Sequence, residues 1–393
     1  MAKSFLLEPR AVGQRLETRF SRQRSAWLQG QGAWPLRLPL GVPTETEAAA
    51  HKAHLGRWLK AWQDWSGPGE VSWTERRWAR LGTQRLPAAI HFTGAAEVAD
   101  FLGLAAQWRQ ASDRLRQVGG RWPGVTPTAS SSWEVLAHWA EADFARLLAL
   151  LDWLAGHPAS GLFMRQLPVA GVDGKWLERH RRVVTRWLGA LQGREIEGVD
   201  FHVLTGLRPM PDRLRLRCLD AGLRRRLGGL GDIEVPVEEA AALALPVHCA
   251  FIVENLQTGL AFEDLPGAVV FMKQGYAVDV YARIPWLQRM PVFYWGDIDT
   301  NGFAILDRLR VHLPAVHSLL MDEATLLRHR PLWTREDRPS AASQLPRLAP
   351  GEAALYAALR SGRWGQGVRL EQERIAWPYA WEQIGHVIAG IAG

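Results

Sequence analysis

The chain has 393 residues, which is more than one ordinary hydrophobic core accommodates, so we expect two or three domains. Hydrophobic residues make up 47% and charged residues 22%, a globular composition that excludes a disordered or fibrous chain. The formal net charge of +7 is unevenly divided, because residues 1–237 carry +10 and residues 238–393 carry −3. This asymmetry suggests one surface that binds a polyanion and another that gathers carboxylates.

Cysteine content and hydropathy indicate where the protein works. Two cysteines, Cys218 and Cys249, are too few for a disulfide framework or a cysteine zinc site, which favours an intracellular chain. The first residues lack the apolar stretch of a signal peptide. The longest apolar stretch, residues 240–253, is interrupted by Pro246 and His248 and is too short to span a bilayer. We therefore expect a cytoplasmic protein that does not enter the membrane.

Tryptophan is abundant in residues 1–120, which we expect to form a helical arm. Trp58, Trp62 and Trp65 are spaced i, i+4 and i+7 and so share one helical face. Packing of these rings between helices is favoured over stacking on nucleic-acid bases. Residues 120–132, rich in glycine, proline and serine, predict a linker or long loop.

The middle of the chain combines two predicted helices with a basic strand. The helices span residues 133–156 and 174–191, and Asp173 is a candidate cap for the second. In the predicted strand at 214–219, arginines alternate with apolar residues and therefore face one side. This order is typical of a winged helix that contacts a DNA backbone, although an ordinary solvated surface explains it equally well. The candidate DNA-binding residues are Lys175, Arg179, Arg182, Arg186, Arg213, Arg215 and Arg217.

After residue 231, short apolar runs alternate with segments of helix length. The predicted strands are residues 247–253, 268–272, 291–295 and 317–321. The predicted helices between and after them are residues 276–287, 302–312 and 323–329. Continuous apolar strands that alternate with helices predict a parallel sheet covered on both faces. In such sheets, ligands bind at the carboxyl ends of the strands.

Carboxylates follow two of these strands. Glu254 directly follows residues 247–253, and Asp297 and Asp299 follow residues 291–295, after Gly296 lets the backbone turn. Residues two apart on an extended segment point the same way, so both aspartates can bind one hard cation. Glu254 would complete a site for Mg²⁺ or Mn²⁺. The alternative is that Asp297 only caps the following helix.

Other motifs are excluded by their spacing or are missing. Residues 297–302 match the start of an EF-hand loop, but the twelfth position holds Arg308 where that loop requires glutamate, and a strand precedes the segment. The sequence also lacks a phosphate-binding P-loop, a serine-hydrolase elbow and a zinc-protease helix. These absences argue against ATP hydrolysis, serine-hydrolase chemistry and zinc proteolysis.

The glutamate and the Asp-x-Asp pair at two strand ends resemble the Toprim domain that topoisomerases, primases and several nucleases share. Five longer segments resemble the JetD subunit of the Wadjet anti-plasmid defence system, namely residues 167–178, 252–259, 294–309, 319–326 and 369–375. The resemblance implies an α/β multidomain protein laid out like the topoisomerase VI A subunit. Its implied parts are an N-terminal helical arm domain (1–125), a winged-helix (CAP-like) DNA-binding domain (126–237) and a C-terminal Toprim domain with a Rossmann-like parallel sheet (238–393).

The same resemblance implies an activity, partners and roles for individual residues. It implies a divalent-metal-dependent endodeoxyribonuclease, a homodimer that cuts double-stranded plasmid DNA reeled in by a condensin-like SMC complex of ATPase, kleisin and accessory subunits. Glu254, Asp297 and Asp299 match the family's metal-binding catalytic acids. Glu371 and Glu373 are candidates for a further ligand or for positioning water, unless both lie on a solvated surface helix.

The positions of the tyrosines bear on the reaction type. Topoisomerase relatives attack DNA with a tyrosine in the winged-helix part, whereas the first of the five tyrosines here is Tyr276. We therefore expect hydrolysis by metal-activated water, without a covalent protein–DNA intermediate. Three alternatives remain open: a non-catalytic DNA-binding adaptor, a topoisomerase-VI-A-like protein and an RNA-directed nuclease.

Overall fold

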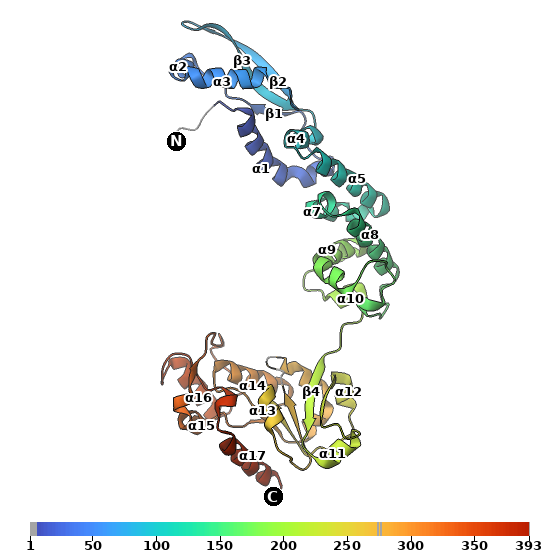
Figure 1. Ribbon diagram of the computed structural model, residues 1–393, viewed down its shortest axis with the longest axis vertical. Helices are drawn as coiled ribbons and strands as arrows, with labels where there is room; N and C mark the ends of the chain where they lie inside the picture. The colour runs from blue at the N-terminus through green and yellow to red at the C-terminus, as the bar shows by residue number, and fades with distance from the viewer. Residues whose placement is uncertain (1–5, 273–274, 276, 393) are drawn as a thin grey trace. The chain divides into compact units, whose positions relative to one another are not determined.

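The computed structural model describes residues 6–272, 275 and 277–392 and divides into two compact units (Figure 1). The first unit is Met1–Pro209 and the second is Met210–Gly393. This division precedes the boundary predicted at 237/238, because the strand expected in the winged helix belongs to the second unit. The further division of the first unit at 125/126 stays a prediction. Within the described residues, none of the helices combines the length and apolarity that crossing a bilayer requires.

The sequence predicted a purely helical N-terminal part, but this part of the first unit also contains strands. An antiparallel sheet of order β1-β3-β2 lies among its helices, and β2 and β3 form a long hairpin beside α2 and α3 (Figure 1). Much of β2 is exposed and charged, so no apolar run marks it as a strand. The elements are α1 (Pro9–Leu28), β1 (Leu36–Pro39), α2 (Glu45–Ala50), α3 (Lys52–Gln63), β2 (Glu70–Trp78), β3 (Gly82–Phe92), α4 (Ala95–Phe101) and α5 (Ala105–Arg121).

The tryptophans of α3 pack in the core of this unit. Trp58 and Trp62 are fully buried, and both indole N–H groups donate to the carbonyl of Leu7, at 3.0 and 2.8 Å. Trp65 follows the end of the helix, and its ring lies against those of Trp62 and Phe101. The interpretation as core packing is thus confirmed for Trp58 and Trp62.

The remainder of the first unit is a chain of helices. Residues 120–132 are helical turns rather than a linker, because Pro123 and Pro127 occupy first-turn positions that tolerate proline. The helix predicted over 133–156 is broken at residues 138–140. Asp173 caps α9, as predicted, and accepts from the Trp176 N–H at 2.7 Å. The elements are η1 (Pro123–Val125), α6 (Thr126–Ser130), α7 (Trp133–Ala137), α8 (Glu141–Gly156), η2 (Met164–Gln166), α9 (Gly174–Gln192) and α10 (Phe201–Thr205).

The second unit is built on a six-stranded sheet of order β5-β4-β7-β6-β8-β9. The strands are β4 (Arg213–Cys218), β5 (Asp232–Pro236), β6 (Cys249–Val253), β7 (Ala268–Met272), β8 (Val292–Trp295) and β9 (Val316–Ser318). The four predicted strands, β6 to β9, pair in parallel. Strand β4 pairs antiparallel with both β5 and β7. The sheet is therefore mixed and not wholly parallel. The strand expected in a winged helix is β4, which pairs with β5 and β7.

Helices and short strands surround this sheet. The segment predicted as a helix at 276–287 forms two 3₁₀ turns separated at Pro285, and Tyr276 lies outside the described residues. Trp377 of α17 packs its ring near those of Phe262 and Trp295. The elements are α11 (Ala221–Arg226), α12 (Val237–Ala242), α13 (Leu256–Ala261), η3 (Val278–Arg283), η4 (Pro285–Arg289), α14 (Thr300–His312), α15 (Glu323–Arg328), η5 (Arg330–Leu332), β10 (Thr334–Arg335), α16 (Pro350–Ser361), β11 (Val368–Arg369), η6 (Gln372–Arg374) and α17 (Trp377–Ala392).

Candidate functional site

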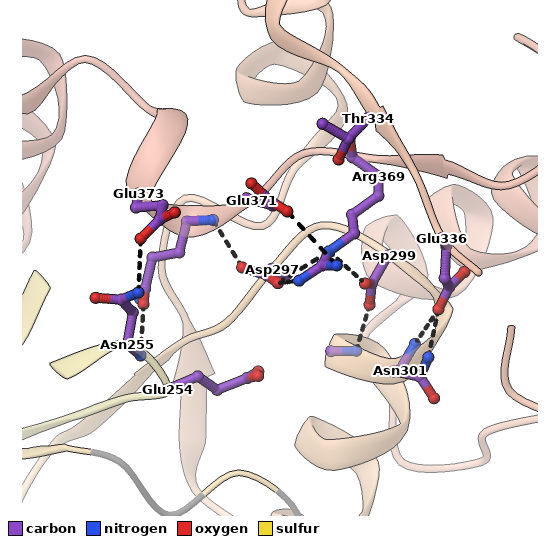
Figure 2. Close-up of polar contacts among 12 residues, drawn as sticks. Glu254, Asn255, Asp297, Asp299, Asn301, Thr334, Glu336, Arg369, Glu371 and Glu373 are labelled. Atoms are coloured by element: carbon purple, nitrogen blue, oxygen red, sulfur yellow. Dashed lines mark hydrogen bonds and ion pairs between the residues drawn. The ribbon is translucent and has the colours of Figure 1, made fainter. Parts of the chain in front are cut away.

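The predicted acids lie at the carboxyl ends of two neighbouring parallel strands. Strands β6 and β8 pair directly, with Val253 opposite Trp295. Glu254 follows the first strand, and Asp297 follows the second by two residues (Figure 2). The five residues of β6 and the four of β8 are all buried. The packed sheet therefore fixes the positions of the two strand ends from which the acids project. The structure therefore places these acids at one edge of the sheet, where the sequence led us to expect them.

Asp299 caps the following helix, a role that the sequence had offered to Asp297. Its Oδ1 accepts from the Gly302 N–H at 2.7 Å, and the side chain is buried. Burial raises the pKa of Asp299 to about 6, and the charges of Glu336 and Asp297 add to the effect, although the Gly302 N–H and Arg369 oppose it. Gly302 is required here because a Cβ would collide with the Asp297 carbonyl.

A single guanidinium contacts three of the acids. Arg369 donates to Oδ2 of Asp297 from Nε at 3.1 Å and from Nη2 at 2.5 Å. Its Nε lies 3.2 Å from Oδ2 of Asp299, and its Nη1 lies 3.6 Å from Oε1 of Glu371. Figure 2 shows the guanidinium between the two aspartates. Burial disfavours the charged arginine, but the hydrogen bond and charge of Asp297 outweigh it and raise the pKa of Arg369.

Glu254 is a partly buried carboxylate that accepts a hydrogen bond from the Tyr294 phenol. Its pKa is raised to about 7, mainly by burial and also by the charges of Asp297 and Asp299, against the opposing effects of Tyr294 and Arg369. A Cβ at residue 296 would collide with this carboxylate and with the phenol. Gly296 is thus needed for close packing as well as for the turn.

Gln372 connects the two strand ends and was missed by sequence reasoning. Its backbone N–H donates to Oδ1 of Asp297 at 2.7 Å. Its side chain accepts from the Asn255 N–H at 3.0 Å and donates to the Trp295 carbonyl at 2.6 Å. The residue is 1% exposed, so these bonds are shielded from water. Only its place between the two acids 371 and 373 could have drawn attention to it.

The acids on either side of Gln372 have different surroundings. Glu371 is partly buried and accepts from Arg374 Nε at 2.7 Å in addition to its contact with Arg369. Glu373 is exposed and accepts from Asn255 Nδ2 at 2.9 Å. Glu373 therefore reaches the residue next to Glu254, while Glu371 lies on the arginine side of the site.

Glu336 is a further buried acid that the sequence did not reveal. It accepts from the Thr300 hydroxyl at 2.8 Å and from Asn301 Nδ2 at 2.6 Å. It also accepts from the backbone N–H groups of both residues, at 3.3 and 3.1 Å. These bonds fix the start of α14 and, with it, the position of Asp299.

The donor set suits a hard divalent cation in composition, because carboxylate oxygens are the ligands that Mg²⁺ and Mn²⁺ prefer. In the part of the chain that the structure describes, however, no group of three or more His, Cys, Asp or Glu residues is arranged to hold a metal ion. The positive charge of Arg369 stands among three of the acids instead. Arg369 therefore offsets part of the negative charge that these acids bring together.

Basic residues of α9 form an exposed surface in the first unit. Lys175, Arg179, Arg182 and Arg186 share one face of the helix, opposite the buried residues Leu177 and Val184. Among the described residues, none of the four forms an ion pair, and Arg186 donates to the Ser131 hydroxyl at 2.9 Å. This face is available to a polyanion.

The candidate DNA-binding arginines of β4 are held by contacts within the second unit. They belong to the second unit and have partners on its own strands and loops. Arg215 forms a two-bond ion pair with Asp232, at 2.9 and 2.6 Å. Arg217 donates to backbone carbonyls, including that of Leu260 at 2.6 Å, and Arg213 lies 3.4 Å from Glu234. Pairing in the sheet therefore accounts for this arginine pattern.

Two family models match the chain. The first, described as Wadjet protein JetD, C-terminal, matches residues 206–384, and the second, an uncharacterized protein conserved in bacteria, N-terminal (DUF3322), matches residues 9–189. The chain belongs to the Wadjet JetD family. The JetD model spans the strand-end site from Glu254 to Glu373, and the other model spans the basic face of α9 up to Arg186. Comparison with curated proteins gave no match.

Proposed function

We propose that this JetD family member is a divalent-metal-dependent DNA endonuclease that hydrolyses plasmid DNA as the effector subunit of an SMC-type Wadjet complex. Its family implies a role in Wadjet defence and association with other Wadjet subunits. The observation that supports catalysis is the position of Glu254, Asp297 and Asp299 at the carboxyl ends of adjacent parallel strands. A Toprim-like fold of the second unit, winged-helix DNA binding through α9 and a homodimer are parts of the same proposal.

The acids and their supports have separate roles in this proposal. Glu254, Asp297 and Asp299 would hold Mg²⁺ or Mn²⁺, with Glu371 as a further ligand. A bound divalent cation lowers the pKa of an attacking water and stabilises the charge that develops on the scissile phosphate. Glu373, held by Asn255, would position that water. Gln372 and Glu336 keep the ligand-bearing loops in register.

The proposal includes a DNA-binding surface that contacts the backbone and does not read sequence. The exposed basic residues of α9 are suited to phosphate contacts, and such contacts position a duplex without identifying its bases. Arg215 is given a smaller part in these contacts, because it already forms an ion pair with Asp232.

Hydrolysis is favoured over attack by a protein phenol. No tyrosine precedes Tyr276 in the sequence, and Tyr281 and Tyr294 are fully buried. Burial raises the pKa of Tyr281 and, together with the neighbouring Glu254, that of Tyr294, so neither phenol is disposed to ionise. Water is therefore the nucleophile that the proposal requires.

Cleavage of circular and linear plasmid, with and without the partner complex, tests the proposal. With Mg²⁺ or Mn²⁺ and partners, wild-type protein should cut circular plasmid, whereas Glu254→Gln and Asp297→Asn should bind DNA with unchanged affinity and leave it intact. Glu382→Gln, at an exposed glutamate of α17, serves as the matched control and should cut normally. Cleavage by Glu254→Gln at the wild-type rate would contradict the proposal.

A non-catalytic adaptor is the second candidate, favoured by the engagement of Arg369 with the acids in place of a metal-binding arrangement. An assay of the defence of cells against plasmids separates the two functions. Defence that survives Glu254→Gln supports the adaptor, and loss of defence with DNA binding intact supports the nuclease. Parallel assays on structured RNA test the RNA-directed alternative. DNA trapped covalently on the protein by detergent would contradict hydrolysis and favour a topoisomerase-like reaction.

A further inference from the structure

Arg369 occupies the position at which the candidate acids converge. Its guanidinium contacts Asp297 through two nitrogens and also reaches Asp299 and Glu371. Three carboxylates brought together without a counter-charge would repel one another. Arg369 therefore supplies, in the protein alone, positive charge that holds these loops together.

The backbone of Arg369 is fixed while its side chain has room to move. Strands β10 and β11 pair Thr334 with Arg369, and the next residue, Leu370, exchanges two backbone hydrogen bonds with Ile298, at 2.9 and 3.1 Å. The Arg369 side chain is 34% exposed. Rotation about its side-chain bonds can thus withdraw the guanidinium toward solvent without breaking the backbone pairing.

A guanidinium and a divalent cation on the same carboxylates compete with each other, because their like charges repel at that short distance. Arginine remains charged at any pH at which the protein is folded, so Arg369 cannot leave the site by losing a proton. A metal ion must displace it as a cation, and the free energy of its ion pairs is then subtracted from the free energy of metal binding. Partly buried, multiply hydrogen-bonded arginine contacts of this kind are stronger than exposed pairs.

We propose that Arg369 is a built-in counter-ion that competes with the divalent metal for Asp297 and Asp299 and so sets the metal affinity of the site. This inference rests on the proposed function, because it concerns the same carboxylates. It predicts that the metal-free site stays organised and that metal binds more weakly than the acids alone would allow. Residue 369 is then a positioning residue of the centre and not a ligand.

Titration of the purified full-length protein with Mn²⁺ tests the inference directly, by calorimetry or by electron paramagnetic resonance of free Mn²⁺. Arg369→Gln should lower the Kd for Mn²⁺ by about tenfold or more, as expected for loss of an ion pair of one to a few kcal/mol. In the presence of EDTA the same variant should unfold at a lower temperature than wild type, and saturating Mn²⁺ should raise its Tm by more than it raises that of wild type.

Arg363→Gln is the matched control. It removes one positive charge from the same unit, but Arg363 pairs with Glu323, which is not one of the candidate ligands. Its Kd should change by less than about threefold. Equal tightening in both variants would mean that general charge governs affinity and would overturn the inference, as would unchanged or weaker binding by Arg369→Gln.

Two further variants keep the result interpretable. Arg369→Lys retains the charge but loses the two-nitrogen contact with Asp297, so it should bind Mn²⁺ a few-fold more tightly than wild type even if Arg369→Gln does not fold. An unchanged Kd for the folded Lys variant overturns the inference. Asp297→Asn should abolish binding. If wild type and Asp297→Asn bind Mn²⁺ equally, the proposed metal site itself fails, a result distinct from failure of the Arg369 competition alone.

Discussion

Glu254 carries its carboxylate in surroundings that disfavour a negative charge. It is partly withdrawn from water, it faces the two aspartates of the neighbouring strand, and its pKa rises to about 7. Asp299, with a pKa of about 6, is affected in the same direction. In the unfolded chain these groups return to ordinary values, 4.5 for Glu254. Proton binding is therefore linked to folding in the metal-free protein.

The sign of this linkage gives a prediction at the residue scale. Between pH 4.5 and 7, folded Glu254 holds a proton that the unfolded chain has lost, so the free energy of unfolding falls as the pH rises through that window. The loss from Glu254 amounts to at most about 3 kcal/mol, less where solvent screens the charge. Glu254→Gln keeps the acceptor for Tyr294 and should flatten this slope. Urea unfolding in EDTA at pH 5, 6, 7 and 8 measures it, and parallel curves for wild type and variant would contradict the prediction.

Single residues also show how far the sequence could predict the site. The three acids were found because each follows an apolar strand, a local pattern that survives without coordinates. Arg369, Gln372 and Glu336 were not, because their contacts depend on residues 334–374 folding back over the Asp-x-Asp loop. Nothing near Glu336 in the sequence indicates that its partners are Thr300 and Asn301.

At the scale of elements, predictions succeeded where a continuous run or face of apolar residues is buried. Strand β7 and helix α9 begin at the predicted residues. The β2–β3 hairpin was missed because β2 is charged and much of it is exposed, so no apolar run marks it as the partner of β3. The basic strand β4 was recognised as a strand but assigned to the wrong neighbours, because alternating arginines look the same whether they meet DNA or acids on an adjacent strand.

The contrast between α9 and β4 gives a prediction for DNA binding. Arg179→Ala and Arg182→Ala together should weaken binding to duplexes of any sequence and reduce the slope of log K against log salt by about 2, since each phosphate contact contributes about 0.9. Arg215→Ala, the control, should leave the slope unchanged because Asp232 already pairs with that arginine. Fluorescence anisotropy between 50 and 200 mM salt provides the measurement. A full loss of slope in the β4 variant would reverse the assignment.

On the scale of the whole molecule, the described residues form two separate hydrophobic cores. One extends from Leu6 to Leu207 and the other from Leu214 to Ile384, and they share no residue. The charge is divided in the same way, since Met1–Pro209 carries +8 and Met210–Gly393 carries −1. The exposed basic face of α9 therefore belongs to one unit and the acidic site to the other.

This division predicts two unfolding transitions, each sensitive to its own ligand. In calorimetry, duplex DNA should raise the Tm of the first unit only, and Mn²⁺ that of the second unit only. Trp58→Ala and Phe251→Ala, one in each core, should each lower a single transition by roughly 10 °C and so identify it. One cooperative transition that both ligands shift would contradict the prediction.

The bonds of Gln372 have a consequence for biosynthesis. The side chain that joins the end of β6 to the end of β8 lies 117 residues beyond Asn255. A bacterial ribosome adding about 5–20 residues per second needs on the order of ten seconds to cover that interval. Until residue 372 is added, the nascent chain carries first Glu254 and then Asp297 and Asp299 without the arginine and the glutamine that contact them. The two strand ends are therefore joined only late in synthesis.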